Sequence, residues 1–481
     1  MNVTKSKLRI FDDISNYTSS QIFEECFDKL FKVLGLSNTL KRAKLVKQRG
    51  YNIVTLIWQL CQFCISRQTV GMASKSKTTA DENTYYSLLN KANVDWRLIL
   101  QQICINFFKS LKDNNLNEGE LPTFLVFDDT LIAKTGKTME GVSIVFDHTT
   151  HQFQLGYKML LCGIVDGRSF VPLDFSLHRE AHKDGSYGLR PEELQRQYKT
   201  ICKSNSCEAK RIEELDVPKT DEMLEMTKSA IEEKDLHVDY VLIDSWYATP
   251  KVLEKLSQMK LHCIGMAKMD KTLYCTNDGT KMTLANILKN NHLQPHRIRI
   301  DNKYKCIYFC KTAEVKGVKV KLFFVKLGKQ SGWKVLITTD LTLSFEECFK
   351  YYQMRWSVEV CFRNCKQNTN LTRCQSTSLV AQIASMTIAL MTYSMVTYLQ
   401  RMREHDTIGE MFRQLWAEQL EHAIWGECQR MVRLLVEIVN MPVFETVYDL
   451  LAADRENLAD KLQEMVQLLR LHTDRQVVRF D

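Results

Sequence analysis

The chain has 481 residues, of which 45% are hydrophobic and 25% are charged, and its formal net charge is +8. This composition is that of an ordinary soluble globular protein, the length predicts two to four domains, and the total charge is too small to indicate a polyanionic partner by itself. Sixteen scattered cysteines and an N-terminus unlike a signal peptide argue against a secreted, disulfide-linked protein and predict free thiols in a reducing cytoplasm.

Residues 1–118 are predicted to be mostly helical. One amphipathic stretch opens near Ser19, the apolar run Ile53–Ile65 predicts a buried helix, and a third helix is expected from Trp96. Asp81 follows a small polar loop and marks a further helix start. We expect a compact helical domain here.

The spacing Cys61-x-x-Cys64 is that of a metal or redox motif. It lies inside an apolar run, however, and no matching second pair accompanies it. Because free cysteine is among the most buried residue types, core thiols are predicted instead.

From Thr123 the pattern changes to strands. Apolar, glycine-punctuated runs predict strands at Phe124–Phe127, Gly141–Phe146, Phe153–Val165 and Ser169–Leu177. A charged helical segment at about 191–235 leads to a strand at Val238–Ile243 and to a helix from Thr249 with Pro250 at its first position. This order of strands and helices is typical of a ribonuclease-H-like α/β domain.

Residues 265–340 carry a second set of strand patterns, which predicts a β-strand insertion. The runs are Arg297–Ile300, Tyr304–Thr312, Val318–Leu327 and Trp333–Thr338. Nine lysines oppose only two acidic residues within 301–334, and five basic residues occupy 41–49 without an acidic one. Such runs are typical of solvated faces, and they are also compatible with a track for nucleic acid.

A helix is predicted from Ser344, where Ser344-x-x-Glu347 forms a capping box. Tyr352, Arg355, Glu359 and Lys366 follow at spacings of 3, 4 and 7, which places them within about 60° of one another on that helix. The simple alternative is a surface helix with an i,i+4 ion pair.

Two aspartates follow short apolar runs, Asp128 after Phe124–Phe127 and Asp244 after Tyr240–Ile243. With Glu359 they make three carboxylates on two strands and a helix, a set that suits a two-metal phosphodiester-cutting site. Side chains alternate along a strand, so only one of Asp128 and Asp129 is expected to face that site.

Tyr-x2-Arg-x3-Glu-x6-Lys resembles the signature of the insertion sequence four family of bacterial transposases, and the two aspartates resemble the first members of its Asp-Asp-Glu triad. The resemblance covers about 123–366. It implies a ribonuclease-H-like catalytic core interrupted by a β-strand insertion domain, with helical N- and C-terminal regions. The family pattern Asp-x-Thr fits Asp128-Asp129-Thr130 with Asp128 as the catalytic residue, while Asp129 stays the alternative.

The resemblance also implies residue roles. Asp128, Asp244 and Glu359 would hold two Mg²⁺ ions, with Mn²⁺ as a substitute. Arg355 and Lys366 would grip phosphates, Tyr352 would hydrogen-bond one, and Trp356 would stack on an extruded base, with core packing as the alternative for that ring. The remaining expected DNA contacts are Arg363, Lys319, Lys321 and Lys326.

The implied activity is cut-and-paste transposition by a homodimer bound to double-stranded DNA at terminal inverted repeats and target, in the cytoplasm near the nucleoid. Whether a DNA hairpin is made stays open. The expected domains are a DNA-end-binding region 1–118, core segments 119–264 and 341–405, the insertion 265–340, and a dimerisation or DNA-contacting region 406–481.

Two further functions stay possible, a regulatory DNA-binding protein derived from a transposase and a metal-dependent nuclease without strand transfer. The uncharged segment 376–400 is long enough to span a bilayer, but its six or more polar side chains predict a core helix and no membrane partner.

Overall fold

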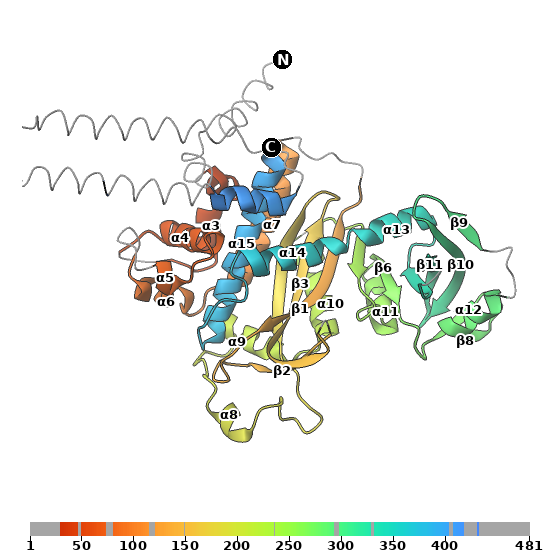
Figure 1. The fold of residues 1–481 in the computed structure, drawn as a ribbon, viewed down its shortest axis with the longest axis horizontal. Helices are drawn as coiled ribbons and strands as arrows, with labels where there is room; N and C mark the ends of the chain where they lie inside the picture. The colour runs from red at the N-terminus through yellow and green to blue at the C-terminus, as the bar shows by residue number, and fades with distance from the viewer. Residues whose placement is uncertain are drawn as a thin grey trace, which may run out of the picture. The chain divides into compact units, whose positions relative to one another are not determined.

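The computed structural model describes residues 29–46, 50–73, 80–114, 121–148, 150–234, 236–292, 298–328, 331–403, 407–417 and 431. Residues 31–404 form one compact unit, whose architecture is drawn in Figure 1. The stretch expected near Ser19 lies outside the described residues, as does most of the region 406–481, of which residues 408–417 are helical.

The unit is built on a mixed sheet of twelve described strands. Along the sheet the order is β2-β3-β1-β5-β6-β12-β11-β10-β7-β8, with β4 paired to β3 and β9 paired to β10. The strands are β1 (Phe124–Ala133), β2 (Ser143–Asp147), β3 (Gln152–Val165), β4 (Phe170–His178), β5 (Tyr240–Ile243), β6 (His262–Ala267), β7 (Leu273–Thr276), β8 (Lys281–Thr283), β9 (Arg299–Asp301), β10 (Cys306–Val315), β11 (Val318–Leu327) and β12 (Lys334–Thr338).

One half of the sheet has both parallel and antiparallel neighbours. β1 runs antiparallel to β3 but parallel to β5, and β5 runs parallel to β6. The start of β1 and all of β4 are buried. The continuous apolar run Phe124–Phe127 follows from cover on both faces, whereas β4 is buried although Asp174, Ser176 and His178 alternate with its apolar residues.

The other half continues from β6 through antiparallel β12, β11 and β10. Val315 and Val318 close the β10–β11 hairpin around Lys316 and Gly317, whose φ angles are 47° and 76°. A two-residue hairpin loop of this kind requires positive φ at both positions, which explains the glycine. Strands β7 to β12 fall within the residues expected for the β insertion.

Helices cover the sheet and form the N-terminal part of the unit. Figure 1 shows α14 crossing the strands β1 and β3, and α13 leading towards β10 and β11. The helices are α3 (Leu36–Arg42), α4 (Ile53–Ile65), α5 (Val70–Ala73), α6 (Glu82–Leu89), α7 (Trp96–Asp113), α8 (Pro191–Gln195), α9 (Cys207–Glu213), α10 (Lys219–Lys228), α11 (Pro250–Gln258), α12 (Leu284–His292), α13 (Phe345–Gln353), α14 (Trp356–Asn368) and α15 (Leu379–Arg403).

The apolar helix α15 is a core helix. It packs against α7, α4 and β4, and 94% of its most apolar window is buried inside the protein. Its length and composition would also suit a membrane span, but burial explains the same sequence. The predicted burial of Cys61 and Cys64 is confirmed, and both thiols are free.

Two predicted helices are interrupted. The charged segment 191–235 is not one helix but α8, α9, α10 and shorter turns, including a π-helix at Ser229–Glu233. The capping box at Ser344 and Glu347 is present, yet the helix that it opens ends at Gln353, and α14 begins three residues later.

Candidate active site

The topology of the sheet brings Asp128 and Asp244 together. The parallel pairing of β1 with β5 ends with Val126 opposite Leu242. Asp128 and Asp244 each lie two residues further along, so the same register places them side by side at the carboxyl ends of neighbouring parallel strands. Side chains at such ends reach the same edge of the sheet, where α/β proteins bind ligands.

The expectation that Asp128 ends its strand is wrong. β1 continues to Ala133, because its antiparallel pairing with β3 runs on from Asp128 opposite Leu161 to Ala133 opposite Gly156. Only the parallel pairing with β5 stops before Asp128. Asp128 therefore lies in a strand that is paired with β3 on one side, while its pairing with β5 on the other side has already ended.

Asp129 points to different partners, as the alternation of a strand requires. Its side chain accepts hydrogen bonds from Lys219 Nζ at 2.9 Å and from the Tyr247 hydroxyl at 3.1 Å. Tyr247 is fully buried, and its backbone N–H donates to Asp244 Oδ1 at 3.3 Å. Tyr247 thus ties Asp129 to the turn that carries Asp244, which is a positioning role.

Asp244 is fixed by its own turn. Its Oδ1 also accepts the backbone N–H of Trp246 at 2.8 Å, so the carboxylate caps the residues that follow β5. Asx turns of this kind hold a short polar side chain in one direction. The second carboxylate is therefore oriented by local backbone alone.

The junction of α13 and α14 supplies the third carboxylate. Arg355 N–H donates to Tyr352 O at 3.0 Å and Val358 N–H donates to Arg355 O at 3.2 Å, so the junction is bonded from residue i to i−3. These bonds make a tight 3₁₀-type turn between two α-helices. The turn links α13, which carries Tyr352, to α14, which carries Glu359, and Arg355 lies at the junction.

Arg355 joins the strand to the helix. Its Nη1 lies 2.7 Å from Asp128 Oδ2, and its Nη2 forms an ion pair with Glu359 Oε1. The side chains of Arg355 and Asp128 are about one seventh exposed, whereas that of Glu359 is one third exposed. The predicted i,i+4 ion pair thus exists, but it belongs to a three-residue bridge that reaches β1.

The electrostatics of Asp128 are unusual. Burial raises the pKa of Asp128 to about 7, an effect that Asp244 reinforces and the Arg355 guanidinium opposes. Burial also raises the pKa of Tyr352 to about 12, with Asp244 and Asp128 among the charges that act on it. Strongly perturbed carboxyls that share a cleft with a second carboxylate are typical of functional sites.

Asp128 and Asp244 open onto a cleft of about 680 Å³, which Glu359 does not line. Lys366 lies in it and donates to Thr130 Oγ1 at 2.7 Å, and burial lowers the pKa of its ammonium group. The residues that line the cleft include Asp128, Asp129, Asp244, Trp246, His148, Lys158, Lys219, Lys268 and Lys366. The lining combines carboxylates with lysines and an aromatic ring.

Trp356 lies in a second pocket of about 530 Å³, together with Tyr352, Arg355 and Phe349. Trp356 is 58% exposed, so the alternative that its ring packs in the core is wrong. Trp356 therefore lies three residues before Glu359 on α14, and it lines a hollow separate from the cleft of Asp128 and Asp244.

The remaining predicted DNA contacts are dispersed. Arg363 and Lys319 are exposed. Lys321 Nζ donates instead to Leu343 O at 2.7 Å and to Leu341 O at 3.1 Å, which anchors the segment before α13. Lys326 lies seven residues after Lys319 and five after Lys321, and these odd spacings place it on the opposite face of β11. A single track containing all three lysines is therefore ruled out by the alternation of the strand.

Sequence reasoning missed the residues that complete the cleft on the β5 side. Trp246 and Tyr247 lie two and three residues after Asp244, and this closeness in sequence is a signal that could have found them. Lys219 and Lys268 come from α10 and from the end of β6, and nothing in the sequence connects them to Asp128.

The donor set suits a hard divalent cation by its chemistry, because Mg²⁺ prefers carboxylate oxygens. In the part of the chain that the structure describes, no three His, Cys, Asp or Glu side chains are arranged to hold a metal ion. The reason at this cleft is Arg355, whose guanidinium occupies the space between Asp128 and Glu359. Gathering the carboxylates around a cation requires Arg355 to withdraw.

Comparison with protein families identifies the class of domain. Residues 60–283 match the family described as DDE superfamily endonuclease, and residues 215–395 match the family described as transposase DDE domain. The two ranges together contain Asp128, Asp244 and Glu359. Residues 60–395 are thus similar to DDE-type endonuclease and transposase domains, and the narrower resemblance to the insertion sequence four family stays a prediction.

Comparisons with individual proteins add little. None of the curated proteins compared with the chain matches it. One solved structure that matches is described as "Cryo-EM structure of piggyBac transposase synaptic complex with hairpin DNA (SNHP)", with 13% identity, 85% of this chain and 79% of that chain covered, and a TM-score of 0.41. A similarity at this TM-score does not establish a shared fold, and no residue role is taken from it.

Proposed function

We propose that this protein is the transposase of a bacterial insertion sequence of the insertion sequence four type, which cuts DNA at terminal inverted repeats and transfers the freed 3′ ends to a target. The observation that carries the proposal is that Arg355 bridges Asp128 to Glu359 while the strand register brings Asp244 beside Asp128, inside the residues matched by DDE domain families. Arg355, Lys366 and Tyr352 border the same carboxylates.

The order of the strands supports a ribonuclease-H-like core. In β4-β3-β1-β5-β6 only β1, β5 and β6 run parallel, while β3 and β4 form an antiparallel meander with β1. Along the chain, β1 to β4 are followed by helices, by β5 and by α11, which is the chain order expected from the sequence for such a core. In the proposal, 119–264 and 341–405 form it and 265–340 is the insertion.

In the proposed reaction, Asp128, Asp244 and Glu359 hold two divalent ions, Mg²⁺ or its substitute Mn²⁺, which supply an activated water and stabilise the leaving oxygen when bound. Arg355 then exchanges its two carboxylate partners for a DNA phosphate, so the guanidinium keeps a charged partner throughout. Lys366 and Tyr352 contact neighbouring phosphates, Arg363 contacts the backbone further along α14, and Trp356 stacks on an extruded base.

The proposed partners are double-stranded DNA and a second copy of the chain in the cytoplasm. Regions 1–118 and 406–481 are assigned to end recognition and to dimerisation or DNA contact. The presence of Asp128, Asp244 and Glu359 argues against the alternative of a regulatory protein that no longer cuts DNA.

Strand transfer separates the transposase from the alternatives. The full chain, incubated with Mg²⁺, a labelled duplex ending in the repeat that borders its gene and a supercoiled target plasmid, should join the labelled 3′ end to the plasmid. Nicking without joining would identify a nuclease, and binding without nicking would identify a regulatory protein. A duplex of the same length with a scrambled repeat is the matched control for end recognition.

A further inference from the structure

Trp246 is a large aromatic residue held open to solvent beside a proposed metal ligand. The residue is 48% exposed and lines the same cleft as Asp128 and Asp244. Its backbone N–H holds Asp244, but this bond does not involve the indole. Tyr247, the next residue, is fully buried and provides the packing of the turn. The indole of Trp246 is therefore not needed to build the turn.

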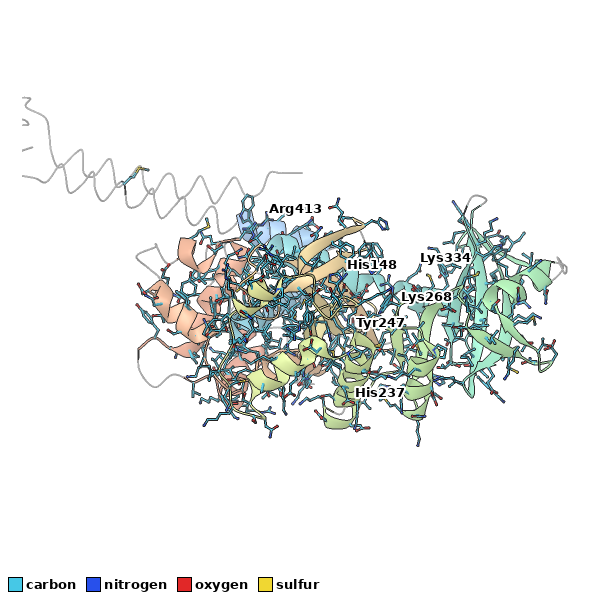
Figure 2. All side chains as sticks on the ribbon, turned by 90° about the horizontal axis from the view of Figure 1, so that it is seen from below. His148, His237, Tyr247, Lys268, Lys334 and Arg413 are labelled. Carbon is cyan, nitrogen blue, oxygen red and sulfur yellow. The ribbon has the colours of Figure 1, made fainter. Side chains whose placement is uncertain are left out.

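Basic side chains surround this ring. Lys268 Nζ lies 4.3 Å from the ring centroid and Lys219 Nζ lies 5.5 Å from it. The His148 ring centroid is 6.2 Å away. Figure 2 shows His148, Lys268 and Tyr247 in the same central region of the unit. Lys219 is also bound to Asp129, whereas Lys268 is exposed at the end of β6.

An exposed aromatic ring among cations fits single-stranded nucleic acid. A nucleobase stacks on the π-face, and cations next to the ring bind the phosphates on either side of that base. A fully paired duplex offers such a ring no free base face, because its bases stack on one another. The cleft of Trp246 shares no lining residue with the pocket of Trp356, so this surface is a second platform.

We propose that Trp246, with Lys268 and Lys219, binds an unpaired nucleotide of the DNA strand next to the scissile phosphate. The proposal rests on the proposed DNA-cleaving function and adds a substrate feature to it: local strand opening on the β5 side of the carboxylates. The base stacks on the indole in place of the Lys268 ammonium group, which then pairs with the adjacent phosphate.

The test compares two DNA probes with the full chain. One probe is the element-end duplex, and the other is the same duplex with a four-nucleotide single-stranded gap beside the cleavage position. Trp246→Ala should bind the gapped probe about ten-fold more weakly than the parent and the paired probe equally well. Trp246→Phe should recover most of the loss, since it keeps a ring. Tyr198→Ala is the matched control, because Tyr198 is also 48% exposed but lines neither cleft nor pocket.

The outcomes separate this inference from the proposed function. Equal binding of the gapped probe by the parent and Trp246→Ala, while the parent still cleaves its end duplex, would overturn the platform alone. Failure of the parent to bind either probe would overturn both. An unchanged thermal unfolding midpoint for Trp246→Ala excludes misfolding, and an unchanged salt dependence of binding identifies the loss as stacking.

Discussion

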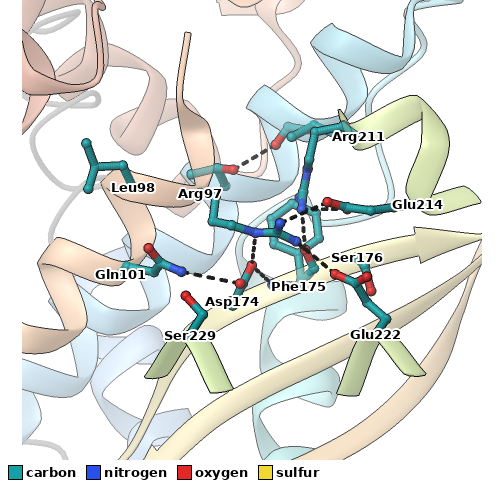
Figure 3. A network of polar contacts seen from close by, with 12 residues as sticks. Arg97, Leu98, Gln101, Asp174, Phe175, Ser176, Arg211, Glu214, Glu222 and Ser229 are labelled. Atoms are coloured by element: carbon teal, nitrogen blue, oxygen red, sulfur yellow. Dashed lines mark hydrogen bonds and ion pairs between the residues drawn. The ribbon is translucent and has the colours of Figure 1, made fainter. Parts of the chain in front are cut away.

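The protein uses arginine to bridge carboxylates in two places, and the two differ in what surrounds the bridge. At the cleft, Arg355 joins Asp128 to Glu359, whose side chain is one third exposed. In the second place, shown in Figure 3, Arg97 reaches Asp174 and Glu214 at 2.8 Å each and Glu222 at 3.3 Å. There the three carboxylates are each less than a tenth exposed.

The second bridge is structural. Arg97 starts from α7, and its partners lie on β4, on the turn after α9 and on α10, so one side chain fastens helices to the sheet edge. Arg211 adds a bond to Glu214 at 2.9 Å and one to Phe175 O at 2.7 Å. A pocket of about 460 Å³ adjoins this bridge too, and Lys210 and Lys228 are among its lining residues. The three carboxylates that bind Arg97 are buried, however, whereas Glu359 at the other bridge is partly solvated. Similar ion pairs can therefore fix a fold or prepare a site, depending on whether a substrate can replace the arginine.

The largest effect on stability should come from Arg97→Ala. Removing the arginine leaves three buried carboxylates without their common partner, which costs about 3–5 kcal/mol of the free energy of unfolding. Urea denaturation measures it. Arg179→Ala is the control, because the Arg179–Asp216 pair is surface-exposed and should cost about 1 kcal/mol or less. If Arg97→Ala and Arg179→Ala lower the free energy of unfolding equally, the proposed structural role of Arg97 is wrong.

Arg355→Ala should behave in the opposite way. Glu359 is partly solvated and Asp128 readily takes up a proton, so the loss of stability should be smaller, about 1–2 kcal/mol. DNA cleavage should nevertheless fall by about two orders of magnitude, since a phosphate contact near the scissile bond is lost. If Arg355→Ala is destabilised as much as Arg97→Ala but still cleaves DNA, Arg355 has a structural role and not the proposed role in cleavage.

The buried network should also give the protein a pH-dependent stability. Burial and the charge of Glu214 raise the pKa of Glu222 to about 7, against 4.5 for an ordinary glutamate. The folded protein binds the Glu222 proton more tightly than the unfolded chain does. The stability that this proton contributes is therefore fully present below about pH 4.5 and is lost as the pH rises through about 7. Glu222→Gln should flatten that fall, as measured by urea midpoints between pH 5 and pH 8. If stability falls equally with pH in the parent and in Glu222→Gln, the proton responsible is bound by another group.

The smallest effect concerns the insertion. Lys319 and Lys326 project from opposite faces of β11, so only one of them can lie along the same DNA. Lys319→Gln and Lys326→Gln, tested separately, should differ. One variant should reduce the slope of log affinity against log salt by about 1, and the other should leave it unchanged. Two unchanged slopes would mean that neither face of this strand contacts DNA.

Much of the fold could be predicted from local sequence. Ile53–Ile65 and Val318–Leu327 were predictable to the residue, because Asn52 caps the helix and the Lys316-Gly317 turn bounds the strand. The break between α13 and α14 was not, because Met354 and Arg355 keep helical dihedral angles and only the hydrogen-bond spacing changes.

The candidate site was predictable where it depends on motifs and not where it depends on distant contacts. Asp128 and Asp244 could be chosen because they follow short apolar runs, and Glu359 could be chosen from its helical spacing. The bridge from Arg355 to Asp128 spans 227 residues of sequence, and the positions of Lys219 and Lys268 depend on how α10 and β6 pack. Lys321 was misjudged because lysine density does not reveal that one ammonium group binds backbone carbonyls.

The central claim is that Asp128, rather than its neighbour, is the strand carboxylate of a DNA-cleaving site. Cleavage of the end duplex in Mg²⁺ by Asp128→Asn and Asp129→Asn tests it with two isosteric changes one residue apart. Asp128→Asn should lose cleavage by about three orders of magnitude while still binding the duplex. Asp129→Asn should stay within about ten-fold of the parent, because the amide still accepts the Tyr247 hydrogen bond. Normal cleavage by Asp128→Asn, or its loss in Asp129→Asn alone, would contradict the account.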